Sequence, residues 1–577
     1  MSERVEYDVL LIGGSPSNLI LAHRLVDLAV ESGTAFTFAV LEKGKEFGAH
    51  IVSGAVSNPR VLKKVFPNLE QSDFPLEGIC THSHFSVLGA QNVWQVPCPF
   101  MPNGVKKEGY YILTLSHVVK WLYEKLEEKV SAAEHIHGDF FPAFAAHAVV
   151  YEEDTVVGVQ VVEQATGSPD EENIYGRVVC FGDKGFVSRD LIAKFNLRDN
   201  PQKWSVGVKE VWELAPDQSF EGQVWHTMGY PLVDGTFGGG FIYGMKDHKL
   251  TIGLIMSLDT PNPNLNPQQK LQDLKKHPWL QAMIKGGKLL KYGAALLPEG
   301  GYYSLPKKFQ VNGALVLGDA LGVLDVSCLS GVDKSMETGY IAAEVIHEVL
   351  KSGGAFTEAA LSPYQRNVMA GFVGEELKAG RYFRHAWEEN PRLLRNYLPE
   401  VLQGIDTTSP YLGLMSVGLK NNPLTAVTDA LRLKGFIEGT AEIGALKYKP
   451  DYQHIIPNYK PASLVSPKYD DATMVSRPDA VFYADPKYHE GNLHIDEFNA
   501  DVCVQCIATY ERLSKTTPCV SDCTAEVHRV DEVAGLHKHG MSLENCIQCR
   551  TCEIICPEVN LKVRAAEQGS GPDFMGL

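Results

Sequence analysis

Residues 7–18, YDVLLIGGSPSN, predict a buried strand that leads directly into a glycine turn. The apolar stretch at 19–30 then has the length of a helix, and a second apolar run at 36–41 ends at Glu42. Strand, glycine turn, helix and strand in this order are typical of the βαβ unit that opens a doubly wound dinucleotide-binding domain. The start of the chain therefore predicts an α/β fold.

The turn departs from the usual Gly-x-Gly-x-x-Gly pattern. Gly13 and Gly14 are present, but Ser15 and Asn18 stand where the second and third glycines belong. Glu42 supplies the acid that accepts the ribose hydroxyls in such domains. An ordinary turn in a parallel sheet is the bland alternative, so the turn alone does not decide the ligand.

A second, distant segment favours a flavin. Gly318-Asp319 follows an apolar strand at 314–317, and Gly331 precedes a predicted helix at 332–350. In FAD proteins a late Gly-Asp places its carboxylate on the ribityl chain, and the next helix directs its N-terminus at the flavin ring. We therefore expect FAD at this site, with a simple N-cap role for Asp319 as the alternative.

Eight of the twelve cysteines lie between Cys503 and Cys556. The run Cys546-Ile-Gln-Cys549-Arg-Thr-Cys552-Glu-Ile-Ile-Cys556-Pro has the spacing of bacterial ferredoxins, in which the fourth cysteine binds a second 4Fe-4S cluster. The remaining four cysteines repeat the pattern with an insertion. By this logic the ligands form a first set, Cys523, Cys546, Cys549 and Cys552, and a second set, Cys503, Cys506, Cys519 and Cys556. Two structural zinc sites are the alternative.

Length and composition limit the other possibilities. A chain of 577 residues is expected to form several domains, and a net charge of −17 argues against a nucleic-acid partner. The sequence has no apolar targeting segment before residue 7 and no stretch of 18 uncharged apolar residues, which suggests a cytoplasmic protein without a spanning helix.

The predicted order of domains follows from these patterns. It comprises a discontinuous FAD-binding domain of the glutathione-reductase type at 1–200 and 290–400, an inserted β-rich domain at 201–289, a helical surface segment at 401–449, a proline-rich strap at 450–490, and a ferredoxin-like α+β module at 491–577.

Together with the cysteine tail, these motifs resemble the electron-transfer-flavoprotein:quinone oxidoreductase family over nearly the whole chain. Matching segments include Glu42-Lys43, Gly48-Ala-His50, Ser53-Gly54 and Thr236-Phe237-Gly238-Gly239. The resemblance implies that Lys43, Ser53 and Gly54 lie among the FAD contacts, that Phe237, Gly238 and Gly239 line a quinone pocket, and that the first cysteine set binds a 4Fe-4S cluster.

The resemblance also implies an activity and partners. An oxidoreductase of this family accepts electrons from reduced electron transfer flavoprotein and passes them through its cluster and FAD to quinone, as a peripheral protein on the inner face of the cell membrane. Three features separate this chain from the family pattern: the second cysteine set, Thr114 in place of an arginine near the flavin, and a short apolar segment at 410–419. With Ser15 and Asn18, they motivate an alternative, a non-catalytic iron-sulfur electron-transfer or assembly subunit with a decayed flavin site. A flavin-dependent isoprenoid reductase or hydroxylase is a second rival, which the cysteine module disfavours.

Overall fold

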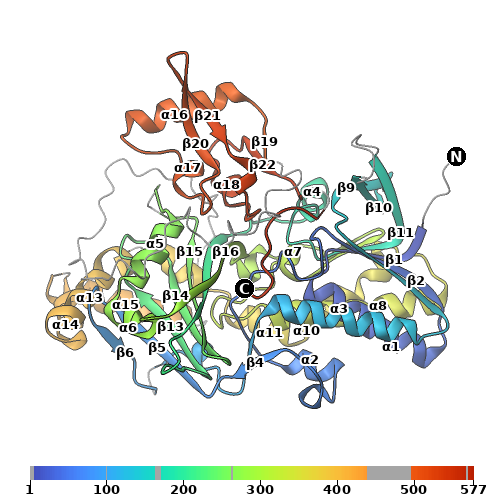
Figure 1. Ribbon diagram of the computed structural model, residues 1–577, viewed down its shortest axis with the longest axis horizontal. Coiled ribbons are helices and arrows are strands. Elements are labelled where there is room, and N and C mark those ends of the chain that lie inside the picture. The colour runs from blue at the N-terminus through green and yellow to red at the C-terminus, as the bar shows by residue number, and fades with distance from the viewer. Residues whose placement is uncertain are drawn as a thin grey trace.

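A computed structural model of the chain describes residues 6–98, 101–162, 171–260, 264–390, 392–420, 422–437, 495–566 and 569–577. Two large sheets lie side by side, and a cysteine-rich module sits over them (Figure 1). The strap predicted at 450–490 falls outside the described residues.

The first large sheet carries five parallel strands in the order β18-β11-β1-β2-β8. Its strands are β1 (Glu6–Ile12), β2 (Phe36–Glu42), β8 (Ile136–Pro142), β9 (Ala146–Glu152), β10 (Thr155–Val162), β11 (Glu171–Phe181), β17 (Gln310–Val311) and β18 (Ala314–Val316). Because the chain winds outward in both directions from β1, the C-terminal ends of β1 and β11 border the crevice where such sheets bind ligands. The predicted α/β fold and its opening βαβ unit are confirmed.

Helices cover this sheet and complete its core. The long helices α1 (Pro16–Ser32), α3 (Leu115–Ser131) and α8 (Val332–Ser352) lie together on one face (Figure 1). Helix α1 begins where Ser15 caps it by accepting the Asn18 amide at 3.4 Å, and it ends at Gly33, whose φ of 70° favours glycine. Shorter helices are α2 (Arg60–Val65), α4 (Ser188–Lys194), α7 (Gly318–Leu321), α9 (Glu358–Leu361), α10 (Pro363–Ala370) and α11 (Phe372–Ala379).

The second large sheet is almost entirely antiparallel, in the order β16-β12-β15-β14-β13-β5-β6. Its strands are β5 (His82–Leu88), β6 (Val93–Gln95), β12 (Trp204–Glu213), β13 (Gln223–Gly229), β14 (Gly238–Met245), β15 (Lys249–Ser257) and β16 (Lys288–Pro298), with helices α5 (Pro267–Lys275) and α6 (Pro278–Ile284) beside it. The sheet extends beyond residues 201–289, because β5 and β6 join it from a distant part of the chain. A small sheet, β3 (Ala55–Ser57), β7 (Tyr111–Leu113) and β4 (Leu76–Ile79), lies between the two.

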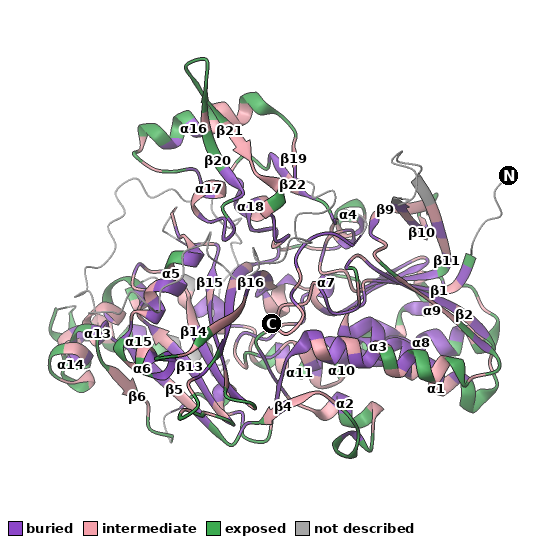
Figure 2. Ribbon diagram, viewed as in Figure 1, coloured by how far each residue is buried: buried purple, intermediate pink, exposed green. Residues whose placement is uncertain are grey.

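A helical segment forms one end of the molecule. It contains α12 (Phe383–Glu389), α13 (Leu398–Thr407), α14 (Pro410–Lys420) and α15 (Pro423–Ile437). Helix α14 is largely exposed (Figure 2), although many of its residues are apolar. Within the described parts of the chain, no helix combines the length and the hydropathy needed to cross a bilayer.

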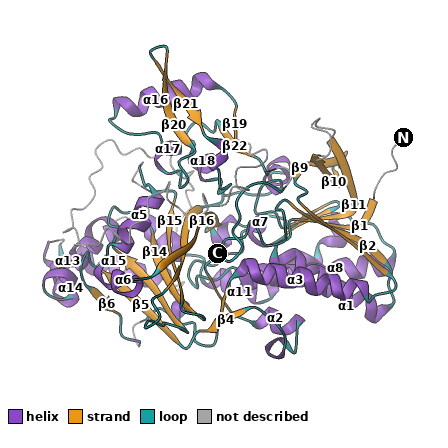
Figure 3. Cartoon of the chain, viewed as in Figure 1, coloured by secondary structure: helices purple, strands orange, loops and turns teal. Residues whose placement is uncertain are grey.

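The cysteine module is a small mixture of helices and two-stranded sheets (Figure 3). It comprises β19 (Ile495–Glu497), α16 (Ala500–Arg512), α17 (Pro518–Ser521), β20 (His528–Val533), β21 (Leu536–Met541), α18 (Thr551–Ile555) and β22 (Leu561–Val563). Ile547 of the module and Phe574 of the C-terminal tail share a hydrophobic core with the second sheet. The tail continues across the first sheet's loops, where the Phe574 amide donates to the Ala49 carbonyl at 2.7 Å. The module is therefore packed against both large sheets.

Candidate functional site

The glycine turn after β1 holds the acid that ends β2. The Gly14 amide donates to Glu42 Oε2 at 2.9 Å, and the Gly44 amide donates to Oε1 at 2.7 Å. Gly13 has a φ of 92°, and a Cβ added at Gly14 would lie only 2.5 Å from the Phe47 ring. Both glycines are therefore required by geometry, and Glu42 lies beside the turn as the sequence predicted.

The two departures from the glycine pattern are accommodated locally. Asn18 is fully buried, and its Nδ2 donates to the carbonyls of Ile12 and Gly13, each at 2.9 Å. Gly182, at the end of β11, leaves the space that these side chains need, because a Cβ there would lie 2.5 Å from Ser15 Oγ. Asn18 thus ties helix α1 to strand β1 by hydrogen bonds where a glycine would allow close contact.

A cavity of about 670 Å³ begins at this turn. It runs from Ser15 past Asp319 and the N-terminus of α8 at Gly331 to the glycine-rich start of β14. A second cavity of about 110 Å³ adjoins it, since Ser15, Gly182 and other residues line both, and Glu42 lines this second cavity. The combined volume lies within the range of cofactor sites. The hydrogen-bond donors and the space along the two cavities fit a dinucleotide cofactor whose ring points toward β14.

The late Gly-Asp segment lies in the main cavity. Gly318 has a φ of 55°, and its amide donates to Thr338 Oγ1 at 3.0 Å, which fixes the turn before α7. Asp319 is partly exposed in the cavity, and Lys184 Nζ lies 3.7 Å from its carboxylate. Helix α8 directs its N-terminus from Gly331 into the same space, where its dipole favours negative charge.

Lys43 points toward the cysteine module. Its Nζ lies 2.7 Å from His50 Nδ1 and donates to Gln548 Oε1 at 3.0 Å. Burial lowers the pKa of Lys43 to about 8, while the Glu42 carboxylate opposes that shift. Cys549 and Arg550 line the smaller cavity along with Lys43. The cysteine loop is therefore part of the wall of the nucleotide site.

The Ser53-Gly54 segment is held by the second sheet. Lys209 Nζ donates to the Ser53 carbonyl at 2.8 Å, and the Tyr243 hydroxyl donates to the Gly54 carbonyl at 3.3 Å. All four residues line the main cavity. This contact joins the loop of the first sheet to the face of the second.

The predicted quinone residues lie at the far end of the same cavity. Phe237 packs against Phe383 and Trp387 of α12, with ring centroids 6.4 and 6.0 Å apart. A Cβ added at Gly239 would collide with the Thr227 carbonyl oxygen, and one at Gly238 would collide with that of Ile255. Both glycines therefore serve the close approach of strands, and Phe237 supplies the aromatic wall.

Several residues that line the main cavity were not predicted from the sequence. His226 is only 6 % exposed, and its buried Nδ1 has no hydrogen-bond partner among the described residues. Burial lowers the pKa of His226 to about 3, so the ring is neutral. Lys209, Tyr243, Phe383 and Trp387 also line the cavity. Each sits in an ordinary strand or helix, so only the tertiary structure identifies it.

The eight cysteines of the module lie close enough for their thiols to affect one another, both within the predicted sets and, at Cys519 and Cys552, between them. Burial raises the pKa of Cys552 far above its ordinary value, and the thiols of the other three first-set cysteines and of Cys519 in the second set raise it further. Burial raises the pKa of Cys519 to about 12, and the other three thiols of the second set act in the same direction. Thiols that influence one another lie close together, and binding a cationic centre would favour their deprotonation.

Backbone amides donate hydrogen bonds to several cysteine sulfurs, as expected if these sulfurs bind a cluster. Amides donate to the sulfurs of Cys523, Cys546 and Cys556 at 3.3, 3.4 and 3.2 Å. Gln548 and Arg550 have φ values of 54° and 66°, which fold the loop between the first-set cysteines. Such N–H···S contacts surround cluster thiolates and tune their potentials.

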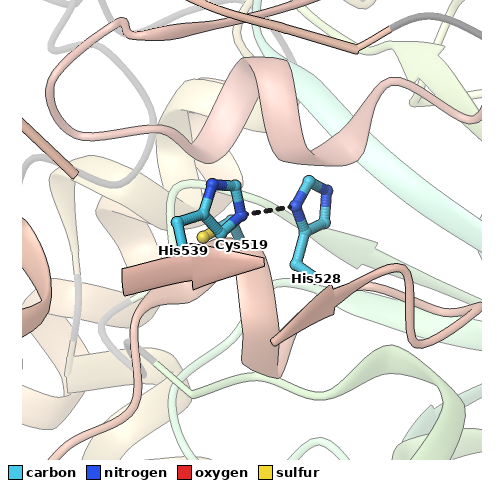
Figure 4. Close-up of side chains that lie close together, drawn as sticks. All are labelled: Cys519, His528 and His539. Atoms are coloured by element: carbon cyan, nitrogen blue, oxygen red, sulfur yellow. Dashed lines mark hydrogen bonds between the residues drawn. The ribbon is translucent and has the colours of Figure 1, made fainter. Parts of the chain in front are cut away.

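One arrangement near the second set suits a single ion instead. Cys519, His528 and His539 bring one ligand atom each within 4.8 Å of the others (Figure 4). However, the two rings already share a hydrogen bond of 2.8 Å, and Glu497 holds the other nitrogen of His539 at 3.0 Å. A single ion here would have to displace one of the two hydrogen bonds of His539, and it would compete with the second set for Cys519.

Known proteins resemble this chain in sequence and fold. Residues 204–297 match the family model described as "ETF-QO, ubiquinone-binding". Proteins named electron transfer flavoprotein-ubiquinone oxidoreductase are 30% identical in Caenorhabditis elegans, over 99% of this chain and 92% of that protein, and 29% identical in Pseudomonas aeruginosa, over 100% of both. A geranylgeranyl bacteriochlorophyll reductase-like protein from Thermoplasma acidophilum shares the fold, with a TM-score of 0.53 and 15% identity over 75% of this chain and all of that chain.

Proposed function

Because this chain belongs to the electron transfer flavoprotein-ubiquinone oxidoreductase family, we propose that it passes electrons from a reduced electron transfer flavoprotein through 4Fe-4S clusters and FAD to a membrane quinone. One observation carries the proposal. A single path of adjoining cavities has the nucleotide turn at one end, the aromatic wall of Phe237 at the other, and the cysteine loop at Cys549 in its side.

The chain's own residues hold FAD along this path. Gly13, Gly14, Ser15 and Glu42 would hold the nucleotide half, with Lys43 beside them, and Ser53, Gly54, Gly318, Asp319 and Gly331 would contact the ribityl chain and ring. When bound, FAD supplies the one- and two-electron chemistry that joins a cluster to a quinone. The protein contributes position, charge and exclusion of water.

The two cysteine sets have different positions relative to this path. Cys549 of the first set lines the nucleotide cavity, whereas Cys503 and Cys506 of the second set lie on α16, on the far side of the module (Figure 1). We assign one 4Fe-4S cluster to each set. In this arrangement the second set would hold its cluster on the outer side of the module, and the first set would hold its cluster beside the FAD site.

The helical segment supplies a membrane contact. Apolar side chains on α14 and α15 are strongly exposed, among them Leu419 at 80% and Leu424 at 75%. Helix α15 packs against α12, which carries Phe383 and Trp387 of the aromatic wall. This continuity supports a peripheral membrane contact, which we place on the inner face of the cell membrane, with the quinone reaching Phe237 from the bilayer.

The central test uses full-length protein purified without oxygen. We expect one FAD per chain after denaturation, and reoxidation of the reduced protein by a soluble quinone analogue. Reduced electron transfer flavoprotein should reduce the same preparation. Protein that holds no flavin and accepts none would contradict the catalytic proposal and favour the assembly or electron-transfer subunit.

Metal analysis tests the cluster assignment separately. Two 4Fe-4S clusters require about eight irons per chain, and a Cys503→Ser, Cys506→Ser double variant should retain about four. His528→Ala is the matched control, because it removes a ligand of the single-ion arrangement and none from either cysteine set. About four irons and one zinc in the wild type, with the zinc lost in His528→Ala, would replace the second cluster by a zinc site.

A further inference from the structure

Lys209 lies inside the main cavity without an acidic partner. It is only 3 % exposed, and its Nζ makes one hydrogen bond, to the Ser53 carbonyl. Among the described residues no carboxylate lies within 4 Å of it. A buried ammonium group with no counter-ion is unfavourable, so the protein keeps it at a cost to stability.

The sheet around Lys209 explains why the charge stays unpaired. Lys209 in β12 lies directly opposite Gly253 in β15 and Gly293 in β16. Neither neighbour has a side chain, and the space above them is filled by the rings of Phe241 and Phe574. The lysine stem therefore runs through apolar surroundings, and its charged end is carried to the cavity.

Three of the other four buried lysines in the described residues behave differently, whereas the fourth, Lys107, also donates to a backbone carbonyl, that of Cys328. Lys275 forms an ion pair with Glu210 at 3.0 Å, Lys334 pairs with Glu376 at 2.7 Å, and Lys203 pairs with Asp259 at 3.1 Å. Each of these lysines has a counter-ion within the fold. Lys209 has a partner only if the cavity's occupant supplies negative charge.

We propose that Lys209 is the fixed positive charge that stabilises the reduced flavin ring in this cavity. The inference rests on the proposed function, because FAD must occupy the cavity. Uptake of two electrons and one proton by the ring, with reduced clusters or dithionite as the electron source, leaves one negative charge on the flavin. The segment that Lys209 holds, Ser53-Gly54, lies among the residues assigned to the ring, so the ammonium group is close to where that charge develops.

The electrostatics of the site agree with this role. Burial lowers the pKa of Lys209 to about 7, and the Glu77 carboxylate opposes that shift. Negative charge in the cavity would hold the proton on Lys209 more firmly. The N-terminus of α8, at Gly331, directs its dipole into the same cavity and acts in the same direction.

Flavin redox equilibria of the full-length protein provide the test. Lys209→Met removes the charge and keeps the stem, Lys209→Gln also keeps a donor for the Ser53 carbonyl, and Lys209→Arg keeps the charge. Lys288→Met, at an exposed position on the same sheet, is the control. Each protein is equilibrated with a reference dye, and the ratio of reduced to oxidised flavin is read from the spectrum.

The Met and Gln variants should bind FAD, but with a ratio lower by about tenfold or more, as expected for one charge within about 10 Å at an effective dielectric constant of about 20. A tenfold change corresponds to about 30 mV for this two-electron couple. The Arg variant and the control should match the wild type.

Other results would overturn the proposal. An unchanged ratio in the Met and Gln variants would show that the charge does not act on the flavin. Loss of FAD from all three Lys209 variants would make Lys209 a structural tether, and loss from Met and Gln alone would assign its charge to the oxidised cofactor. Wild-type protein without FAD would overturn the proposed function itself, before any variant is compared.

Discussion

Replacing Lys275 by methionine should destabilise the second sheet strongly. The Lys275 and Glu210 side chains are both 0% exposed, and Lys275 Nζ lies 3.0 Å from Glu210 Oε1. The variant would leave the Glu210 carboxylate buried, and its hydrogen bonds from described residues would be those of Trp212 Nε1 at 2.7 Å and Gln272 Nε2 at 3.4 Å. Removing one partner of a buried pair costs about 3–5 kcal/mol. Because two donors remain, we expect the lower end, about 3 kcal/mol.

A second variant separates the charge from the packing. Glu210→Gln combined with Lys275→Met removes both charges and keeps the volume of both side chains, and such replacements are often close to neutral. The double variant should therefore lie within about 1–2 kcal/mol of the wild type, giving a coupling of at least about 1 kcal/mol. Lys288→Met, at an exposed position, should change stability by less than about 0.5 kcal/mol.

Native-state hydrogen exchange is the suitable assay, because a chain with several domains does not unfold in one step. Amides of β12 and β15 should exchange about 100-fold faster in Lys275→Met, since 1.4 kcal/mol corresponds to a factor of ten. Exchange in the first sheet should not change. If the single variant exchanged like the wild type, or if the double variant were less stable than the single one, the reasoning about the buried charge would be wrong.

Three further predictions concern the surface, the quinone wall and the docking of the cysteine module. Aspartate at both Leu419 and Leu424 should reduce binding to lipid vesicles in a flotation assay, while the reaction with a soluble quinone analogue stays unchanged. Phe237→Ala should raise the concentration of quinone analogue needed for half-maximal reoxidation by about tenfold, because it loses ring contacts worth about 1.4 kcal/mol. The cluster spectra should not change. If that concentration were the same as in the wild type, Phe237 would not be part of the quinone site. Burial raises the pKa of Glu553, but the nearby charges of Arg550 and Arg189 outweigh it, so the net pKa is lowered. The Glu553 carboxylate therefore stabilises the docked module fully above its ordinary pKa of 4.5, and this contribution is lost as the pH falls through the lowered pKa. Protease cleavage between the module and the sheets should rise over that acid range in the wild type and should already be high at neutral pH in Glu553→Gln.

Local patterns in the sequence predicted the parts of the fold that depend on neighbouring residues. The apolar strand at 7–12 and the glycine turn after it gave β1 and the start of α1, because their spacing is set within one βαβ unit. Local spacing also predicted the cysteine sets, and the structure brings these thiols near one another within and between the sets. The binding of clusters stays a prediction.

Features that depend on distant segments were not predictable. Asn18 looked unfavourable in the glycine turn, but the space for it is provided by Gly182 on another strand. Strands β5 and β6, at 82–95, join a sheet formed mainly by residues after 203. The aromatic wall combines Phe237 with α12, far along the chain. In each case the deciding contact is made by tertiary packing, which a single sequence does not display.

Two neighbouring charged residues in β12 have different surroundings, which the sequence alone does not predict. Lys209 and Glu210 are adjacent, and in the sequence they look like an ordinary pair of charged residues, but both are buried in the structure. Because side chains alternate along a strand, they face opposite sides of the sheet. Glu210 meets Lys275 on the helix-covered side, whereas Lys209 enters the cavity and forms no ion pair with any described residue. One charge is thus neutralised by the fold, and the other requires a ligand, which is why the same substitution to methionine should alter stability at Lys275 and flavin potential at Lys209.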